Sequence, residues 1–146
     1  MTSLLNSNPV KVFQTNKWEK FLINKITDFN ILNPIVVTSE GNKKRLGLDN
    51  IFNIDSIFCL NKSNPDFDDC MKVMDFSKTD TFDGVISIGG GSVMDLAKVV
   101  ISYISLKDYN LIELINYKGH FKSVVPSIFI PTTHGTGSEV TMWGTI

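Results

Sequence analysis

The chain has 146 residues, and 14 basic side chains against 15 acidic ones give it a formal net charge of −1. Apolar residues make up 42% of it, which excludes a disordered chain and is enough for one domain with a sizeable core. The near-zero charge argues against a protein that binds nucleic acid or an anionic membrane surface.

The first third of the chain contains a strand-like run, a helix and a buried strand. Residues 10–13 are a short β-like run, and residues 16–29 place apolar side chains at helical spacing. Residues 35–38 are continuously apolar up to a threonine, which is typical of a strand that is buried on both faces. We expect a turn over residues 39–42, followed by a short helix that ends at Leu46.

The middle of the chain alternates strands and helices. Residues 56–60 form the next expected strand, and a helix should begin at Pro65, with the proline in its first turn. Residues 85–88 are the strongest strand of the chain. Residues 92–106 form a helix that is apolar nearly all round, so we expect it to be heavily buried.

The last expected strand covers residues 127–130 and ends at Pro131. This alternation of strands and helices predicts an α/β fold with a Rossmann-like parallel sheet flanked by helices. Such sheets bind ligands outside the carboxyl ends of their strands. The chemistry should therefore lie just after the strands.

The cysteine count, the amino terminus and the lengths of the apolar runs also predict the cellular location of the protein. Two cysteines, Cys59 and Cys70, are too few for a disulfide framework, and we expect both to be buried free thiols. The amino terminus lacks the pattern of a secretory signal, and no apolar run approaches the ~20 residues that cross a bilayer. We therefore expect a cytoplasmic protein without a membrane partner.

A glycine-rich turn follows the strand at 85–88. Its three glycines, at 89–91, let the backbone turn sharply and let an anion approach, and the helix after them offers free N–H groups. Ser92 can cap this helix or donate its hydroxyl, and Asp95 and Lys98 are spaced for a helical ion pair. The alternative is that Ser92 and Asp95 form an ordinary capping box and that the glycines only make a tight loop.

A second polar loop follows the strand at 127–130. It contains five hydroxyl side chains and two glycines between residues 132 and 141. Such a loop suits contacts with phosphate, ribose or amide groups. The alternative is an ordinary surface loop with Ser/Thr turns.

Together the two loops resemble the iron-containing (group III) alcohol dehydrogenase family, within the dehydroquinate synthase-like superfamily. Asn64-Pro65 also matches an Asn-Pro of the family, and the order of the strands agrees over nearly the whole chain. The residues that carry the resemblance are Gly89, Gly90, Gly91, Ser92, Asp95, Ala97, Lys98, Pro131, Thr132, Thr133, Gly135, Thr136, Gly137, Ser138, Glu139, Val140 and Thr141.

Members of the family are NAD(P)-dependent oxidoreductases with an α/β dinucleotide-binding domain and an all-helical domain that holds Fe²⁺ or Zn²⁺ through one Asp and three His. The resemblance implies that residues 1–146 are the first domain, incomplete at its C-terminal end, and that the helical domain is absent from this chain. The implied reaction is hydride transfer between the nicotinamide and an alcohol or aldehyde. The metal ligands would then lie beyond residue 146, and this chain alone, with no catalytic or metal-binding residue, is expected to be inactive.

The resemblance also implies the roles of individual residues. The turn at 89–92 would hold the cofactor pyrophosphate, with Asp95 near the nicotinamide and Asn64 near the adenosine end. We also expect a homodimer or a larger oligomer. The expected cofactor-binding residues are Ser39, Asn64, Gly89, Gly90, Gly91, Ser92, Asp95, Thr132, Thr133, Thr136 and Ser138.

Two positions depart from the family pattern, and the last segment of the chain indicates a subgroup of the family. Ser39 stands where many members have an Asp that repels a 2′-phosphate, so NAD and NADP both stay open, and the adjacent Glu40 could restore a preference for NAD. His134 occupies a position where a small residue is usual in the family. It could donate a hydrogen bond to a phosphate or ribose of the cofactor, or it could be a loop histidine at the rim of the groove. Residues 141–145 resemble a subgroup, linked to phosphonate metabolism, that reduces phosphonoacetaldehyde.

Alternatives of other classes stay open at this stage. The chain could be a relative of glycerol dehydrogenase or of dehydroquinate synthase within the same superfamily. It could instead be a stand-alone nucleotide-binding module without catalysis, or one domain whose other half is supplied separately.

Overall fold

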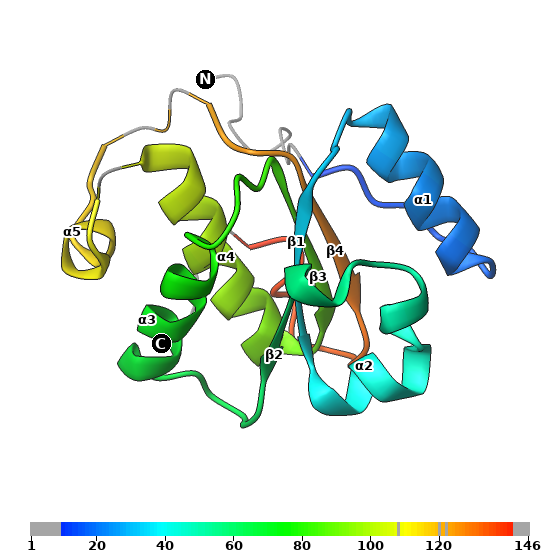
Figure 1. Cartoon of the computed structure of the whole chain (residues 1–146). Helices are drawn as coiled ribbons and strands as arrows, with labels where there is room; N and C mark the ends of the chain where they lie inside the picture. Colours follow the sequence, from blue (N-terminus) through cyan, green and yellow to red (C-terminus); the bar gives the residue numbers. More distant parts are fainter. Residues whose placement is uncertain (1–9, 108, 120, 122, 142–146) are drawn as a thin grey trace, which may run out of the picture.

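The computed structural model describes residues 10–107, 109–119, 121 and 123–141 and shows three layers, with a sheet between two layers of helices (Figure 1). The sheet has the strand order β2-β1-β3-β4, and every neighbouring pair is parallel. The predicted Rossmann-like parallel sheet is therefore confirmed. Its strands are β1 (Pro34–Ser39), β2 (Ile57–Leu60), β3 (Gly84–Gly89) and β4 (Ser127–Pro131).

The helices cover both faces of this sheet. Helices α3, α4 and α5 lie on one face and α1 lies on the other (Figure 1). Two short 3₁₀ turns, Leu48–Asn50 and Ile54–Ser56, lie between α2 and β2. The helices are α1 (Trp18–Asp28), α2 (Glu40–Leu46), α3 (Phe67–Phe76), α4 (Gly91–Leu106) and α5 (Leu111–Ile115).

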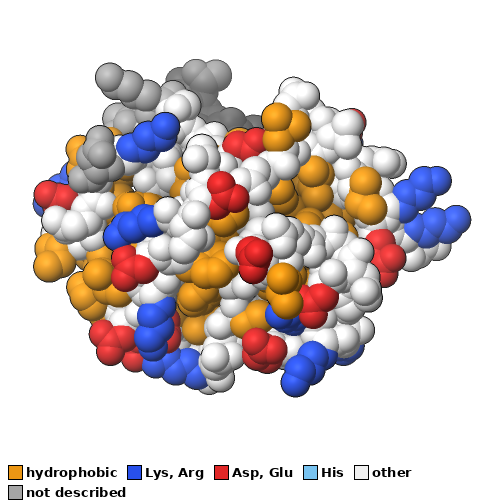
Figure 2. Space-filling view, viewed as in Figure 1, with side chains coloured by type: hydrophobic (Ala, Val, Ile, Leu, Met, Phe, Trp, Pro, Cys, Tyr) orange, Lys and Arg blue, Asp and Glu red, His pale blue; other side chains and the backbone are white. Residues whose placement is uncertain are grey.

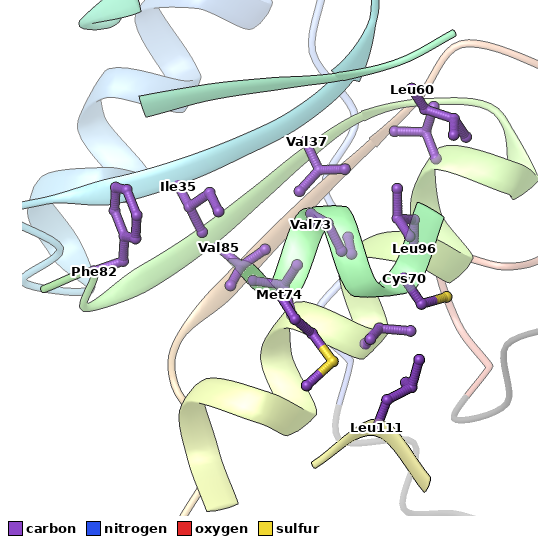
Figure 3. Packing of buried hydrophobic residues seen from close by; sticks show 14 residues of the cluster. Ile35, Val37, Leu60, Cys70, Val73, Met74, Phe82, Val85, Leu96 and Leu111 are labelled. Atoms are coloured by element: carbon purple, nitrogen blue, oxygen red, sulfur yellow. The ribbon is translucent and has the colours of Figure 1, made fainter. Parts of the chain in front are cut away.

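The two central strands are buried on both faces, which explains their largely apolar sequences. Because side chains alternate along a strand, Ile35 and Val85 pack against α3 and α4, whereas Val36 and Ile86 pack toward Leu22 of α1. Figure 3 shows the first of these cores, where side chains from β1 and β3 meet those of α3 and α4. All six residues of β3 are buried, so β3 is the most enclosed element of the sheet.

The strand order creates a topological switch point at the carboxyl ends of β1 and β3. From β1 the chain continues to β2 on one side, and it then crosses to β3 on the other side of β1. The loops that leave β1 and β3 therefore diverge, and ligands of such sheets bind at this switch point.

The predicted strand at residues 10–13 is wrong. These residues have no regular secondary structure, and the side chains of Val12 and Phe13 are 76% and 50% exposed. A four-residue run becomes a strand only where a neighbour supplies hydrogen bonds. Here Phe13 instead packs on Phe21 of α1, with the ring centroids 5.3 Å apart.

Several features of the helices differ from the expectation, and α2 begins at Glu40, within the expected turn at 39–42. Pro65 precedes α3 rather than lying in its first turn, because Asp66 caps the helix in a capping box with Asp69. Helix α4 starts at Gly91, one residue early, and its last turns, residues 101–106, are half-buried rather than buried. Helix α5 was not expected, and a capping box between Asn110 and Glu113 starts it.

Both cysteines are free, but only Cys70 is buried, so the expectation of burial is wrong for the half-buried Cys59. Burial, with a smaller contribution from Glu40, raises the pKa of the Cys59 thiol to about 11. Burial likewise raises the pKa of Cys70 to about 11. None of the helices in the described ranges is long and apolar enough to cross a bilayer.

A buried side-chain hydrogen bond crosses between the two central strands, and its removal gives a test of the fold. The Thr38 hydroxyl donates to the Ile88 carbonyl oxygen at 2.8 Å, and both residues are 0% exposed. We expect Thr38→Val to keep the shape and lower the free energy of unfolding by about 1–2 kcal/mol, measured by urea denaturation.

The matched control is Thr27→Val on α1. Its exposed hydroxyl donates to the Ile23 carbonyl at 3.2 Å, where water can replace it. We expect a change within about 0.5 kcal/mol there. Equal losses in the two variants would contradict a special role for the buried bond.

Candidate functional site

Four loops gather at the carboxyl edge of the sheet, one after each strand. The glycine turn (residues 89–92) leaves β3, and the hydroxyl loop (residues 132–138) leaves β4. The Thr132 N–H donates to the Gly89 carbonyl at 2.9 Å, which continues the pairing of β3 and β4 past the sheet. The glycine turn and the hydroxyl loop therefore run side by side.

The glycines are needed because the hydroxyl loop lies so close. A Cβ at Gly90 would lie 3.1 Å from the Thr133 hydroxyl, and one at Gly91 would lie 3.3 Å from Thr136 Cγ2 and 3.4 Å from Ser138 Oγ. A larger side chain at either glycine would push the hydroxyl loop outward. The missing side chains thus serve the contact between the two loops as well as access to the backbone.

The start of α4 presents open backbone donors. Gly90 is the N-cap, and among the described residues no side chain caps this helix. The first N–H groups of a helix have no partner within it, and α4 is 16 residues long, so its positive end faces the edge of the sheet. This arrangement binds anions, phosphate groups above all.

Ser92 does not cap α4, so the capping-box alternative is wrong. Its hydroxyl oxygen accepts a hydrogen bond from the Asn64 N–H at 3.0 Å. Asp95 is likewise occupied, because the Lys98 ammonium donates to it at 3.1 Å, which confirms the predicted ion pair. Local capping rules could not reveal the Ser92 contact, since its partner lies 28 residues away in the sequence.

Asn64 reaches the site in a left-handed conformation. Its φ is +56°, a value that asparagine tolerates better than most residues, and its backbone is fixed by Ser92 on one side. On the other side Asp66 caps α3, and the Lys62 ammonium lies 2.6 Å from Asp66 and 3.0 Å from Asp69. The loop after β2 is thus tied both to the glycine turn and to its own helix.

The segment after β1 contacts the hydroxyl loop through Asn42, a residue that was not predicted to lie in the site. Ser39 accepts from the Asn42 N–H at 3.3 Å and caps α2, so its own hydroxyl serves the helix. The Asn42 amide then donates to the Thr132 hydroxyl at 3.3 Å, and Arg45 donates to the Asn42 oxygen at 2.7 Å. Asn42 bridges elements 90 residues apart, and an asparagine on a short polar helix gives no signal of this.

The rest of the hydroxyl loop is shaped by two left-handed glycines. Gly135 and Gly137 have φ of +85° and +65°, which side chains with a Cβ rarely adopt. His134, which precedes both glycines, is exposed, in keeping with a loop histidine at the rim. Glu139 follows with a buried oxygen, Oε2, that has no hydrogen-bond partner in the described part of the chain.

A hollow of about 470 Å³ opens beside the carboxyl end of β2 and the side of α3. Its walls combine apolar, amide and charged groups, and the lining residues are Phe58, Cys59, Leu60, Asn61, Lys62, Asp69 and Lys72. Figure 2 shows acidic and basic side chains interspersed over the visible face, without an extended region of one sign. The lining of the hollow itself is mixed, with two lysines and one aspartate beside its apolar side chains.

The structure brings most of the expected site residues together. Asn64, Thr132, Thr133, Thr136 and Ser138 lie at the glycine turn, and Ser39 connects to it through Asn42, whereas Asp95 lies farther along α4 beside Lys98. No group of three or more His, Cys, Asp or Glu that could hold a metal occurs within the described ranges. The described part of the chain does not fit a metal site.

Comparisons with known proteins agree with the resemblance. The model of the family "Iron-containing alcohol dehydrogenase" matches residues 9–146. Long-chain-alcohol dehydrogenase 1 of Geobacillus thermodenitrificans is 42% identical over 73 residues, 48% of this chain and 18% of that protein. The mitochondrial hydroxyacid-oxoacid transhydrogenase of Xenopus laevis is 40% identical over 76 residues, 49% of this chain and 16% of that protein.

A solved structure agrees over almost the whole chain. Sulfoacetaldehyde reductase from Bifidobacterium kashiwanohense in complex with NAD⁺ superposes with a TM-score of 0.74 at 25% identity, covering 92% of this chain and 37% of that chain. This chain therefore spans well under half the length of the relatives that it matches.

The Asn64 loop gives a pH-dependent prediction. The hydrogen bond from Lys62, helped by the Asp69 N–H, lowers the pKa of Asp66 to about 2, against about 3.9 in an unfolded chain. Because the folded state holds the ionised form more tightly, Asp66 adds stability that is fully present above about pH 4 and is lost as the pH falls toward 2. We expect Asp66→Asn to lower the Tm at neutral pH and to have no effect near pH 2 in thermal scans.

Asp68→Asn is the matched control, because Asp68 lies in the same first turn of α3 while Lys62 pairs with Asp66 and Asp69. A Tm difference between wild type and Asp66→Asn that stays constant from pH 7 to pH 2 would show that the carboxylate charge is not what stabilises this loop.

Proposed function

This chain belongs to the iron-containing alcohol dehydrogenase family, and from that premise we propose that it is the dinucleotide-binding domain of an NAD-dependent oxidoreductase. The observation that carries the proposal is the uncapped start of α4, closed in on one side by the hydroxyl loop. Such a cradle has backbone donors and a positive helix end but no fixed anion of its own. A pyrophosphate supplies the missing acceptors.

We propose that the glycine turn and the hydroxyl loop grip the pyrophosphate from two sides. The N–H groups at the start of α4 would donate from one side, and the side chains of Thr133, Thr136 and Ser138 would donate from the other. We assign Thr132 a structural role instead, since its hydroxyl accepts a hydrogen bond from the Asn42 amide. This division explains why the loop carries more hydroxyl groups than its own turns need.

We place the adenosine end toward β2 and the nicotinamide end toward α4. Asn64 contacts the glycine turn through Ser92, and the hollow lies beside the same loop at Asn61 and Lys62, so both would receive the adenosine. Asp95, farther along α4, would lie on the nicotinamide side. The related sulfoacetaldehyde reductase holds NAD⁺ in its structure, which supports NAD as the cofactor here. Binding of NADP stays a prediction, made from the neutral Ser39.

We propose that this domain binds and orients the cofactor while other parts of a complete enzyme supply the metal and the substrate pocket. The nicotinamide, when bound, exchanges a hydride with an alcohol or aldehyde carbon. The relatives include alcohol dehydrogenases, a transhydrogenase and a sulfoacetaldehyde reductase, so they support a small oxygenated substrate without selecting one. The predictions of phosphonoacetaldehyde, a cytoplasmic location and a homo-oligomer stay predictions, and residues 142–145 of the phosphonate-type ending lie outside the described residues.

A titration of the 146-residue chain tests the proposal. We expect NADH to bind, followed by calorimetry and by the nicotinamide fluorescence, and NADPH is titrated in parallel to settle the role of Ser39. Gly91→Val should abolish binding, because its side chain would displace Thr136 and Ser138 from the glycine turn. The control is Gly41→Val, where a Cβ meets nothing within 4 Å.

Absence of heat and of a fluorescence change with both cofactors at millimolar concentration would overturn the binding proposal. Equal affinity of wild type and Gly91→Val would show that the cofactor does not occupy the glycine turn. Oxidation of alcohols by this chain alone would overturn the proposed division between cofactor domain and catalytic groups.

A further inference from the structure

Lys98 makes two hydrogen bonds that together join α4 to the end of the hydroxyl loop. Its ammonium donates to the Asp95 carboxylate and to the Thr141 hydroxyl, both at 3.1 Å. The first bond stays within α4, whereas the second crosses 43 residues of sequence. The cross-link lies about two helical turns from the uncapped start of α4.

This pair is unlike the other lysine pairs of the same spacing. The side chains of Lys98 and Asp95 are 14% and 13% exposed, whereas those of Lys78 and Asp75 are 51% and 64% exposed. An exposed pair is screened by water and contributes little, but a shielded pair holds its geometry. Lys98 is therefore placed to fix a position rather than to keep a surface soluble.

Thr141 connects Lys98 to the hydroxyl loop. Its hydroxyl donates to the Ser138 carbonyl at 3.5 Å, and the Val140 N–H donates to the Gly137 carbonyl at 3.0 Å, so residues 137–141 form one tight turn. At the other end of that turn, Ser138 Oγ lies 3.4 Å from the place of a Cβ on Gly91. The path from Lys98 through Thr141 and Ser138 thus returns to the first residue of α4.

We propose that Lys98 is a positioning residue that sets the spacing between the hydroxyl loop and the glycine turn, and thereby the fit of the cofactor pyrophosphate. This inference rests on the proposed function. The β3–β4 pairing fixes only the beginning of the hydroxyl loop, at Thr132, and the cross-link to Thr141 fixes its far end. Without it, the restraint that α4 places on the far end of this segment would be lost.

The competing role for a lysine here is direct attraction of the phosphates. Asp95 opposes that role, because its carboxylate lies 3.1 Å from the ammonium and neutralises most of its charge as seen from a distance. The two roles differ in a measurable way. A positioning role depends on the Thr141 hydroxyl, whereas a charge role depends only on the lysine and is weakened by salt.

The test compares Lys98→Met, Lys98→Arg, Thr141→Val and the double variant Lys98→Met/Thr141→Val in the full chain, with NADH and ADP-ribose as probes at low and high salt. We expect Lys98→Met and Thr141→Val each to weaken both probes about fivefold, as expected for one net hydrogen bond. The double variant should be no weaker than Lys98→Met, because both changes remove the same contact. Lys98→Arg, which keeps the charge and the donors, should restore most of the affinity.

Lys78→Met is the matched control, since it removes an ion pair of the same spacing beyond the far end of α3. It should leave both affinities unchanged. Thermal scans monitor folding, and if Lys98→Met fails to fold, Thr141→Val and Lys98→Arg still decide the question.

Two results would overturn the inference while leaving the proposed function intact. Wild-type affinity in both Lys98→Met and Thr141→Val would show that the cross-link does not set the groove. Loss confined to Lys98→Met, with a reduced salt dependence, would assign Lys98 to direct charge attraction. Failure of the wild-type chain to bind either probe would instead overturn the proposed function, and the inference with it.

Discussion

The pairing of β3 with β4, extended by one bond from Thr132 to Gly89, is the constraint on which the candidate site depends. A parallel ladder brings two carboxyl ends to the same edge, so two loops distant in sequence leave the sheet together. The enclosure of β3 then fixes where this edge lies, since its six residues are buried and cannot slide. The contacts between the glycine turn and the hydroxyl loop are built on this alignment.

The sheet was predictable because burial on two faces leaves a visible pattern. The apolar run at 35–37 and the run at 85–88, which only Ser87 interrupts, are typical of strands inside a covered parallel sheet, and the structure agrees. The paired loop motifs likewise revealed the family, which the comparisons confirm. The strand predicted at 10–13 is wrong because four residues form a strand only beside a pairing strand. The local sequence does not show whether such a pairing strand is present.

The contacts within the site were less predictable than its position. Ser92 reads as a helix cap by its place in the sequence, yet it binds Asn64, and Asn42 reads as an ordinary surface residue, yet it binds Thr132. Both partners are brought in by the fold from distant segments. The wrong prediction for Ser92 is informative. Because Ser92 does not cap α4, the first backbone N–H groups of that helix stay open.

The position of β4 at the edge of the sheet has a thermodynamic consequence. Like β2 it pairs on one side only, but unlike the other strands it has no buried residue, so it is the least enclosed strand of the sheet. A ligand that touches both the glycine turn and the hydroxyl loop binds only when β4 is docked, and mass action then adds its binding energy to that docking. Amide protons of β4 would exchange with solvent more slowly in the bound state, while those of β3 would change little. The least enclosed strand would thus be the element of the sheet that responds most to occupancy of the site.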